Sequence, residues 1–216
     1  MNNLNKIAGI DYSISSPAMC ICTGDFKFEN LQFFYVSEKK RWNNAQFLSG
    51  QIEGFKALDK EQFLDIDRIT HLSTIFTDCI FDIIQDGEQV EIGVEDYAFA
   101  ANGNITLLAE SMGILKYKLR TDNHNVKPYA PTTIKKFARN VYPIDKQRKS
   151  DGKLIKMDKV AMYDAFVYDT GIDLLKEFGL TQLVTKSGTP TMGNPITDIV
   201  DAYFIAKYHY ENTMKG

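Results

Sequence analysis

The 216-residue chain has only three cysteines, Cys20, Cys22 and Cys79, and each lies in an apolar stretch. An odd number of cysteines with no nearby histidine fits neither a disulfide framework nor a zinc site. We therefore expect buried, reduced thiols. No run of about 18 apolar residues is present, so no membrane-spanning helix is expected. The polar amino terminus resembles no signal peptide, which favours a cytoplasmic location.

Internal repeats and low-complexity tracts are also absent, and a composition of 44% hydrophobic and 25% charged residues is ordinary for a globular protein. We expect a single domain over 1–216. A polar and irregular stretch at about 37–61 is interpreted as a loop insertion, and it contains Lys39, Lys40, Arg41 and the sole tryptophan, Trp42. Long ordered loops are commonly functional or mobile, but the sequence assigns no role to Trp42.

The net charge is −3, but positive charge is concentrated in about one fifth of the chain. From Lys116 to Lys159 there are 13 Lys and Arg against four acids, a net charge of +9. The rest of the chain has 12 bases and 24 acids, a net charge of −12. A basic segment on an acidic body is typical of a phosphate-binding face, although a solvated surface with chance clustering would give the same pattern.

Hydrophobic periodicity and turn residues predict an alternation of strands and helices. The predicted strands are 6–13, 18–23, 31–36, 89–97 and 125–129. The predicted helices are 62–85, 105–119, 131–139, 156–168, 172–178 and a last one that begins at Asn194 and Pro195. The first three strands leave no room for crossover helices, so they are expected to be antiparallel. The predicted fold class is α/β, with a mixed five-stranded sheet and helices on both faces.

Four acidic residues occupy positions where a hydrophobic core would not place them. Asp11 directly follows the apolar strand residues 7–10, and Glu95 ends the fourth strand. Asp198 and Asp201 are three residues apart on the last helix and so share a face. Separately, Asp11 could cap a turn with Ser13, Glu95 could be an exposed strand end, and Asp198 could stabilise the first helical turn.

The four acids together are better explained by a bound cation. An unpaired buried carboxylate costs several kcal/mol, so acids at the ends of apolar strands indicate a positive charge beside them. Magnesium takes oxygen ligands from a few carboxylates and from phosphates. Two such ions can activate water and stabilise the leaving oxygen of a phosphodiester.

These motifs, in this order, resemble those of the RuvC-type Holliday junction resolvases of the RNase H-like superfamily. The motifs are Ile-Ala-Gly-Ile-Asp at 7–11, Gly-Val-Glu-Asp-Tyr at 93–97, the small-residue helix at 108–115 and Asp-Ile-Val-Asp-Ala at 198–202. The resemblance implies an RNase H-like fold in which Asp11, Glu95, Asp198 and Asp201 bind two Mg²⁺ ions. Manganese could substitute for magnesium, since both accept oxygen ligands. It also implies cleavage of branched DNA by a homodimer, because two cuts on a two-fold substrate call for two active sites.

The resemblance further implies a basic residue beside the metals, from a segment that begins at Gly152 and Lys153. Lys156 and Lys159 are both candidates, and the register does not choose between them. An aromatic wedge is expected after the glutamate, where Tyr97 or Phe99 would serve, unless either belongs to the core. The predicted DNA-binding residues are Tyr97, Phe99, Lys135, Lys136, Arg139, Arg148 and Lys153.

The long segments at 37–61 and 181–193 make the chain similar to phage- or virus-encoded relatives, which would place it in a bacterial or infected-host cytosol. Two other functions compete with junction resolution. A broader flap or branch nuclease of the same fold has the same motifs. A sugar kinase or actin-like ATPase also opens on Gly-Ile-Asp, but it needs a second glycine-rich phosphate loop, which this sequence lacks.

Overall fold

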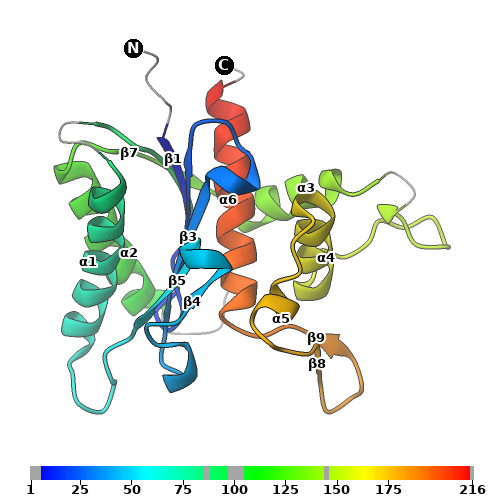
Figure 1. Ribbon diagram of the computed structural model, residues 1–216, viewed down its shortest axis with the longest axis horizontal. Coiled ribbons are helices and arrows are strands. Elements are labelled where there is room, and N and C mark those ends of the chain that lie inside the picture. Colours follow the sequence, from blue (N-terminus) through cyan, green and yellow to red (C-terminus); the bar gives the residue numbers. More distant parts are fainter. Residues whose placement is uncertain (1–5, 85–87, 97–104, 144–145, 215–216) are drawn as a thin grey trace.

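The computed structural model describes residues 6–84, 88–96, 105–143 and 146–214, and Tyr97 and Phe99 fall outside them. A seven-stranded sheet in the order β4-β5-β3-β2-β1-β6-β7 runs through the middle of the molecule (Figure 1). Its strands are β1 (Lys6–Asp11), β2 (Ala18–Thr23), β3 (Leu31–Ser37), β4 (Gln46–Phe47), β5 (Ile52–Lys56), β6 (Glu91–Glu95) and β7 (Asn125–Tyr129).

The predicted strand directions are confirmed. β2 pairs antiparallel with both β1 and β3, whereas β6 pairs parallel with β1 and β7 pairs parallel with β6. The short connections between β1, β2 and β3 permit only antiparallel neighbours, and the helices that precede β6 and β7 allow those two strands to return in parallel. The sheet is therefore mixed, as expected.

The predicted number of five strands was wrong, because the segment at 37–61 is not irregular throughout. β5 extends the sheet by pairing in parallel with β3, with Phe33 opposite Ile52, and β4 pairs with β5 at the edge. β5 was not predicted, because its glycine and charged residues weaken the alternation of apolar and polar residues that indicates a strand. Gly54 is required there, because a Cβ atom would lie 2.4 Å from the carbonyl oxygen of Trp42.

Helices cover both faces of the sheet, which confirms the predicted α/β layers (Figure 1). On one face lie α1 (Asp65–Ile83) and α2 (Ile105–Thr121); on the other lie α3 (Pro131–Val141), α4 (Lys159–Thr170) and α6 (Ile196–Met214). The short α5 (Leu174–Glu177) and a hairpin of β8 (Leu183–Val184) and β9 (Pro190–Thr191) precede α6. No described helix is both long and apolar enough to cross a membrane.

Several element boundaries differ from the predictions. The helix predicted at 156–168 begins at Lys159, because the side chain of Asp158 accepts a hydrogen bond from the backbone N–H of Ala161 and caps the helix there. The last helix begins at Ile196 rather than at Pro195. The three cysteines are free and buried, as expected.

Gly9 brings the last helix onto the first strand. A Cβ atom at this position would lie 2.1 Å from the backbone nitrogen of Ala206 and 2.5 Å from the carbonyl oxygen of Ala202. Only glycine therefore lets the backbone of α6 lie directly against β1. This close approach determines how near the acids of α6 come to the acid that ends β1.

Candidate active site

Asp11 and Glu95 stand side by side at the same end of the sheet. Each is the last residue of its strand, and the parallel register of β1 and β6 places Ile10 opposite Val94 immediately before them. The two carboxyl groups interact directly, which raises the pKa of Asp11 and acts against the effect of burial on the pKa of Glu95. Asp11 is only 8% exposed, so its surroundings are a buried acidic cluster rather than the turn cap that was the alternative.

Asp198 and Asp201 come to this cluster from the first turns of α6. Asp198 is 8% exposed, and its Oδ1 atom accepts a hydrogen bond from the hydroxyl of Thr197 at 3.3 Å. The charges of both helix acids act on Asp11. The four predicted acids are therefore brought together, although they lie on three elements that are distant in the sequence.

Burial makes the four groups hold their protons more tightly than usual, and repulsion between acids adds to this at Asp11 and Asp201. Burial raises the pKa of Asp11 well above its ordinary value, and the charges of Glu95, Asp201 and Asp198 raise it further. Burial also raises the pKa of Glu95, and it raises the pKa values of Asp198 and Asp201 to about 7. A cluster of this kind is a candidate functional site, because its charged form needs cations beside it.

The carboxylate oxygens of the four acids are ligands of the kind that magnesium binds. Among the described residues, no three His, Cys, Asp or Glu side chains are already arranged as a metal-binding group. However, the Oδ2 atom of Asp198 is buried and has no hydrogen-bond partner within the described part of the chain. A buried, unpaired carboxylate oxygen next to three further carboxylates provides the hard oxygen ligands that Mg²⁺ prefers.

A polar group beside Asp198 was missed by the sequence interpretation, which assigned Asn194 to a helix cap. Its amide instead donates to the hydroxyl of Ser16 and accepts from the hydroxyl of Thr197. Ser16 also hydrogen-bonds Asp198, which lowers the pKa of that acid against the effect of burial. The loop after β1 is thus tied to the start of α6, and this holds Asp198 in place.

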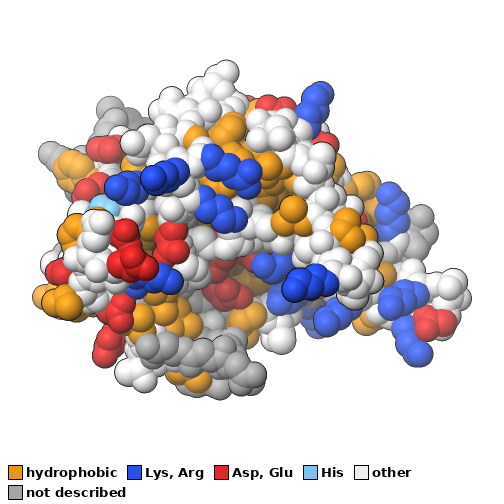
Figure 2. Space-filling model, turned by 90° about the horizontal axis from the view of Figure 1, so that it is seen from below, with side chains coloured by type: hydrophobic (Ala, Val, Ile, Leu, Met, Phe, Trp, Pro, Cys, Tyr) orange, Lys and Arg blue, Asp and Glu red, His pale blue; other side chains and the backbone are white. Residues whose placement is uncertain are grey.

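Three lysines stand beside the acids. Lys135, Lys156 and Lys159 line a hollow of about 220 Å³ together with Asp201. The charge of Lys159 acts on both Asp198 and Asp201, whereas that of Lys135 acts on Glu95 and Asp201. Figure 2 views this end of the molecule and shows acidic side chains in a central hollow, with Lys and Arg side chains gathered around it.

Both lysine candidates line the hollow beside Asp201. Lys159 begins α4, and its charge lowers the pKa values of both helix acids. Lys135, predicted only as a DNA contact, belongs to the same group. Its closeness to the acids depends on the packing of α3 beside α4 and α6, which the sequence pattern does not predict.

The other predicted DNA-binding residues lie farther along the basic region. Lys136 and Arg139 are on α3, and Arg148 and Lys153 belong to a hairpin in which Arg148 pairs with Leu154. This hairpin projects from the body beyond α3 and α4 (Figure 1). None of these four residues lines the hollow beside Asp201.

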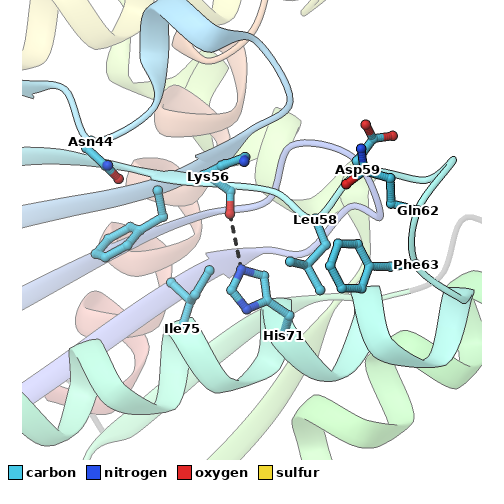
Figure 3. Close-up of a pocket in the computed structure, with 9 residues that line it drawn as sticks. Asn44, Lys56, Leu58, Asp59, Gln62, Phe63, His71 and Ile75 are labelled. Carbon is cyan, nitrogen blue, oxygen red and sulfur yellow. Dashed lines mark hydrogen bonds between the residues drawn. The ribbon is translucent and has the colours of Figure 1, made fainter.

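A second hollow, of about 430 Å³, lies between β5 and α1. Its residues include His71, whose Nε2 atom is 3.1 Å from the carbonyl oxygen of Lys56, together with Phe63 and Ile75 (Figure 3). It shares no lining residue with the hollow beside Asp201, and it contains one acid, Asp59. None of the four clustered acids lines it, so we place the candidate active site at the carboxylate cluster and the adjoining hollow beside Asp201.

The fold is that of RuvC, which confirms the RNase H-like prediction. One structure of Thermus thermophilus RuvC, in complex with Holliday junction substrate, is 14% identical in sequence, with 98% of this chain and 96% of that chain covered and a TM-score of 0.52. A second structure of T. thermophilus RuvC is 14% identical, with coverage of 97% and 96% and a TM-score of 0.50. No family model matches the sequence, and no curated protein matches it.

Proposed function

We propose that the chain is a magnesium-dependent endonuclease that cuts branched DNA, with the four-way junction as its principal substrate. The observation that carries this proposal is the buried cluster of Asp11, Glu95, Asp198 and Asp201 beside Lys135 and Lys159. The same fold in a RuvC that was solved with Holliday junction substrate supports the choice of DNA. Because a fold does not determine a function, the proposal rests on the site.

The four carboxylates would hold two Mg²⁺ ions, which supply an activated water and stabilise charge on the phosphodiester. Asp11 and Glu95 are held by the ends of their strands, and Asp198 is held by Ser16 and Thr197. These supports keep the ligands in place before DNA binds. Lys135 and Lys159 would neutralise the phosphate that enters the hollow. A homodimer would place two such sites on a two-fold junction.

The first test is cleavage of synthetic four-way, flap and linear duplex DNA. We expect cuts in the four-way junction with Mg²⁺ or Mn²⁺ and none with a chelator, because oxygen ligands accept either ion. Faster cutting of flaps than of four-way junctions would favour the broader branch nuclease. Equal cutting of linear duplex would contradict branch selectivity, to which Tyr97 and Phe99 are proposed to contribute.

Lys159→Gln is expected to lower the rate constant of cleavage about tenfold or more, with a smaller change in DNA affinity. The reason is that its charge lies beside two proposed metal ligands, where negative charge develops during the reaction. Single-turnover kinetics measure the rate, and Lys156→Gln is the matched control, with the smaller expected loss. A larger loss for Lys156→Gln would reverse the assignment of the two lysines.

The basic region is expected to make DNA binding strongly dependent on salt. Replacing Lys136, Arg148 and Lys153 together with Gln should flatten the slope of log affinity against log salt by about 0.9 for each phosphate that is no longer neutralised. Fluorescence anisotropy on a four-way junction, with Ca²⁺ in place of Mg²⁺, measures this slope. An unchanged slope would show that DNA lies on another face.

A further inference from the structure

The segment from Glu38 to Trp42, at the start of the insertion, leaves the sheet at the end that carries the acids. Asp11 and Tyr35 both pair with Ala18 of β2, so β1 and β3 run in the same direction with these residues level. The chain that follows β3 therefore emerges at the edge where β1 ends. This places the start of the insertion at the end of the sheet that carries the candidate active site, although no function was predicted for it.

Trp42 anchors this segment to the body. Its side chain is 5% exposed and packs against Phe178, with ring centroids 5.5 Å apart. Its carbonyl oxygen accepts a hydrogen bond from the hydroxyl of Tyr35 at 3.1 Å. Its backbone N–H donates to the carbonyl of Lys39 at 2.9 Å, and the guanidinium of Arg41 stacks over its ring at 4.3 Å. Lys39 and Arg41 thus extend from a fixed backbone.

The side chains of Lys39 and Arg41 face the start of α6. Both line a small hollow of about 50 Å³ with Gly193, Asn194 and Ile196. Asn194 bonds the hydroxyls of Ser16 and Thr197, which in turn bond Asp198. The two basic side chains therefore border the polar group that holds Asp198.

Cations from the insertion and from the basic region act on the acids of the cluster. The charge of Lys39 acts on Asp198, and that of Lys135, on α3, acts on Glu95 and Asp201. A DNA strand that crosses the cluster carries a phosphate on each side of the bond to be cut. Lys135 and Lys159 act at Asp201, whereas Lys39 adds a cation from the insertion at Asp198, next to the charge of Lys159.

We propose that Lys39 and Arg41 bind a backbone phosphate of the substrate strand on the Asp198 side of the scissile bond, so that the insertion is a strand-positioning element. The inference rests on the proposed nuclease function and extends it to a segment outside the family motifs. Lys39 is a positioning residue, because it reaches the neighbouring phosphate rather than the reacting one. Its loss therefore weakens substrate binding and leaves the chemical step intact.

The test measures KM and kcat for four-way junction cleavage. Lys39→Gln is expected to raise KM about fivefold and to leave kcat within about twofold, as for an exposed cation that contacts one phosphate. Lys39→Arg should restore KM. The matched control is Lys40→Gln. This substitution removes the same charge at the next residue, whose side chain does not line the hollow. Its KM should equal that of the unmodified chain.

Phosphate substitution identifies the contact. Junctions are prepared with one uncharged methylphosphonate at successive positions on either side of the cut. At one position, the methylphosphonate should raise the KM of the unmodified chain but should not raise the KM of Lys39→Gln further. An unchanged KM in Lys39→Gln, or equal losses in Lys39→Gln and Lys40→Gln, would overturn the inference. If the unmodified chain cuts the junction and Asp198→Asn abolishes the cut, the nuclease proposal stands whatever the result for Lys39. If the unmodified chain does not cut, both the nuclease proposal and the inference about Lys39 and Arg41 are rejected.

Discussion

Asp11→Asn, Glu95→Gln, Asp198→Asn and Asp201→Asn are each expected to lower the rate of junction cleavage about a thousandfold or more. Each substitution keeps the shape of the side chain but removes the negative charge of a proposed metal ligand. Because the four groups act as one cluster, the loss of any one disrupts the site for both ions. Single-turnover cleavage with Mg²⁺ measures the effect.

Binding and folding are expected to persist in these four variants, because Lys136, Arg148 and Lys153 of the basic region do not line the hollow beside the acids. Anisotropy with a junction in Ca²⁺ should give affinities close to that of the unmodified chain. Asp25→Asn is the control for a surface acid, since its side chain is 77% exposed, and it should cut normally. Substantial residual cleavage in two of the four variants would reject the assignment of the site.

The metal-free protein is expected to be more stable near pH 5 than near pH 8. The unfolded acids titrate near pH 4, whereas Asp198 and Asp201 have pKa values of about 7 in the folded chain. The folded state therefore binds more protons between these two values, and the free energy of unfolding falls as the pH rises through this window. Magnesium should restore stability at pH 8, because it binds the folded, ionised cluster.

Asp201→Asn should raise the stability of the metal-free protein at pH 8 by about 2 kcal/mol, which corresponds to roughly 4–8 °C in melting temperature for a chain of this size. The neutral amide removes one of the repelling charges, so the pH dependence should also become flatter. Thermal melts in chelator at pH 5 and pH 8, with and without Mg²⁺, measure both effects. Asp25→Asn should follow the unmodified chain, and a melting temperature that rises from pH 5 to pH 8 in chelator would contradict the prediction.

Local patterns predicted most of the elements because each depends on near neighbours in the chain. The strand at 125–129 and the start of the helix at 131 were predicted to the residue, since Pro131 and the preceding turn are local signals. β5 was missed because its alternation includes Gly54 and two charged residues. Its pairing depends on the edge that β3 offers and not on its own composition.

The acids of the candidate site could be chosen from the sequence because they interrupt apolar strands and share a helix face. The sequence alone determined that Asp11, Glu95, Asp198 and Asp201 are candidates for one metal site. Only the tertiary structure showed that the charges of Lys159, Lys135 and Lys39 act on these acids. The physical reason is that these relations depend on strand order, on the packing of α3 and α4 against α6, and on the close approach at Gly9, none of which is encoded in the periodicity of a single segment.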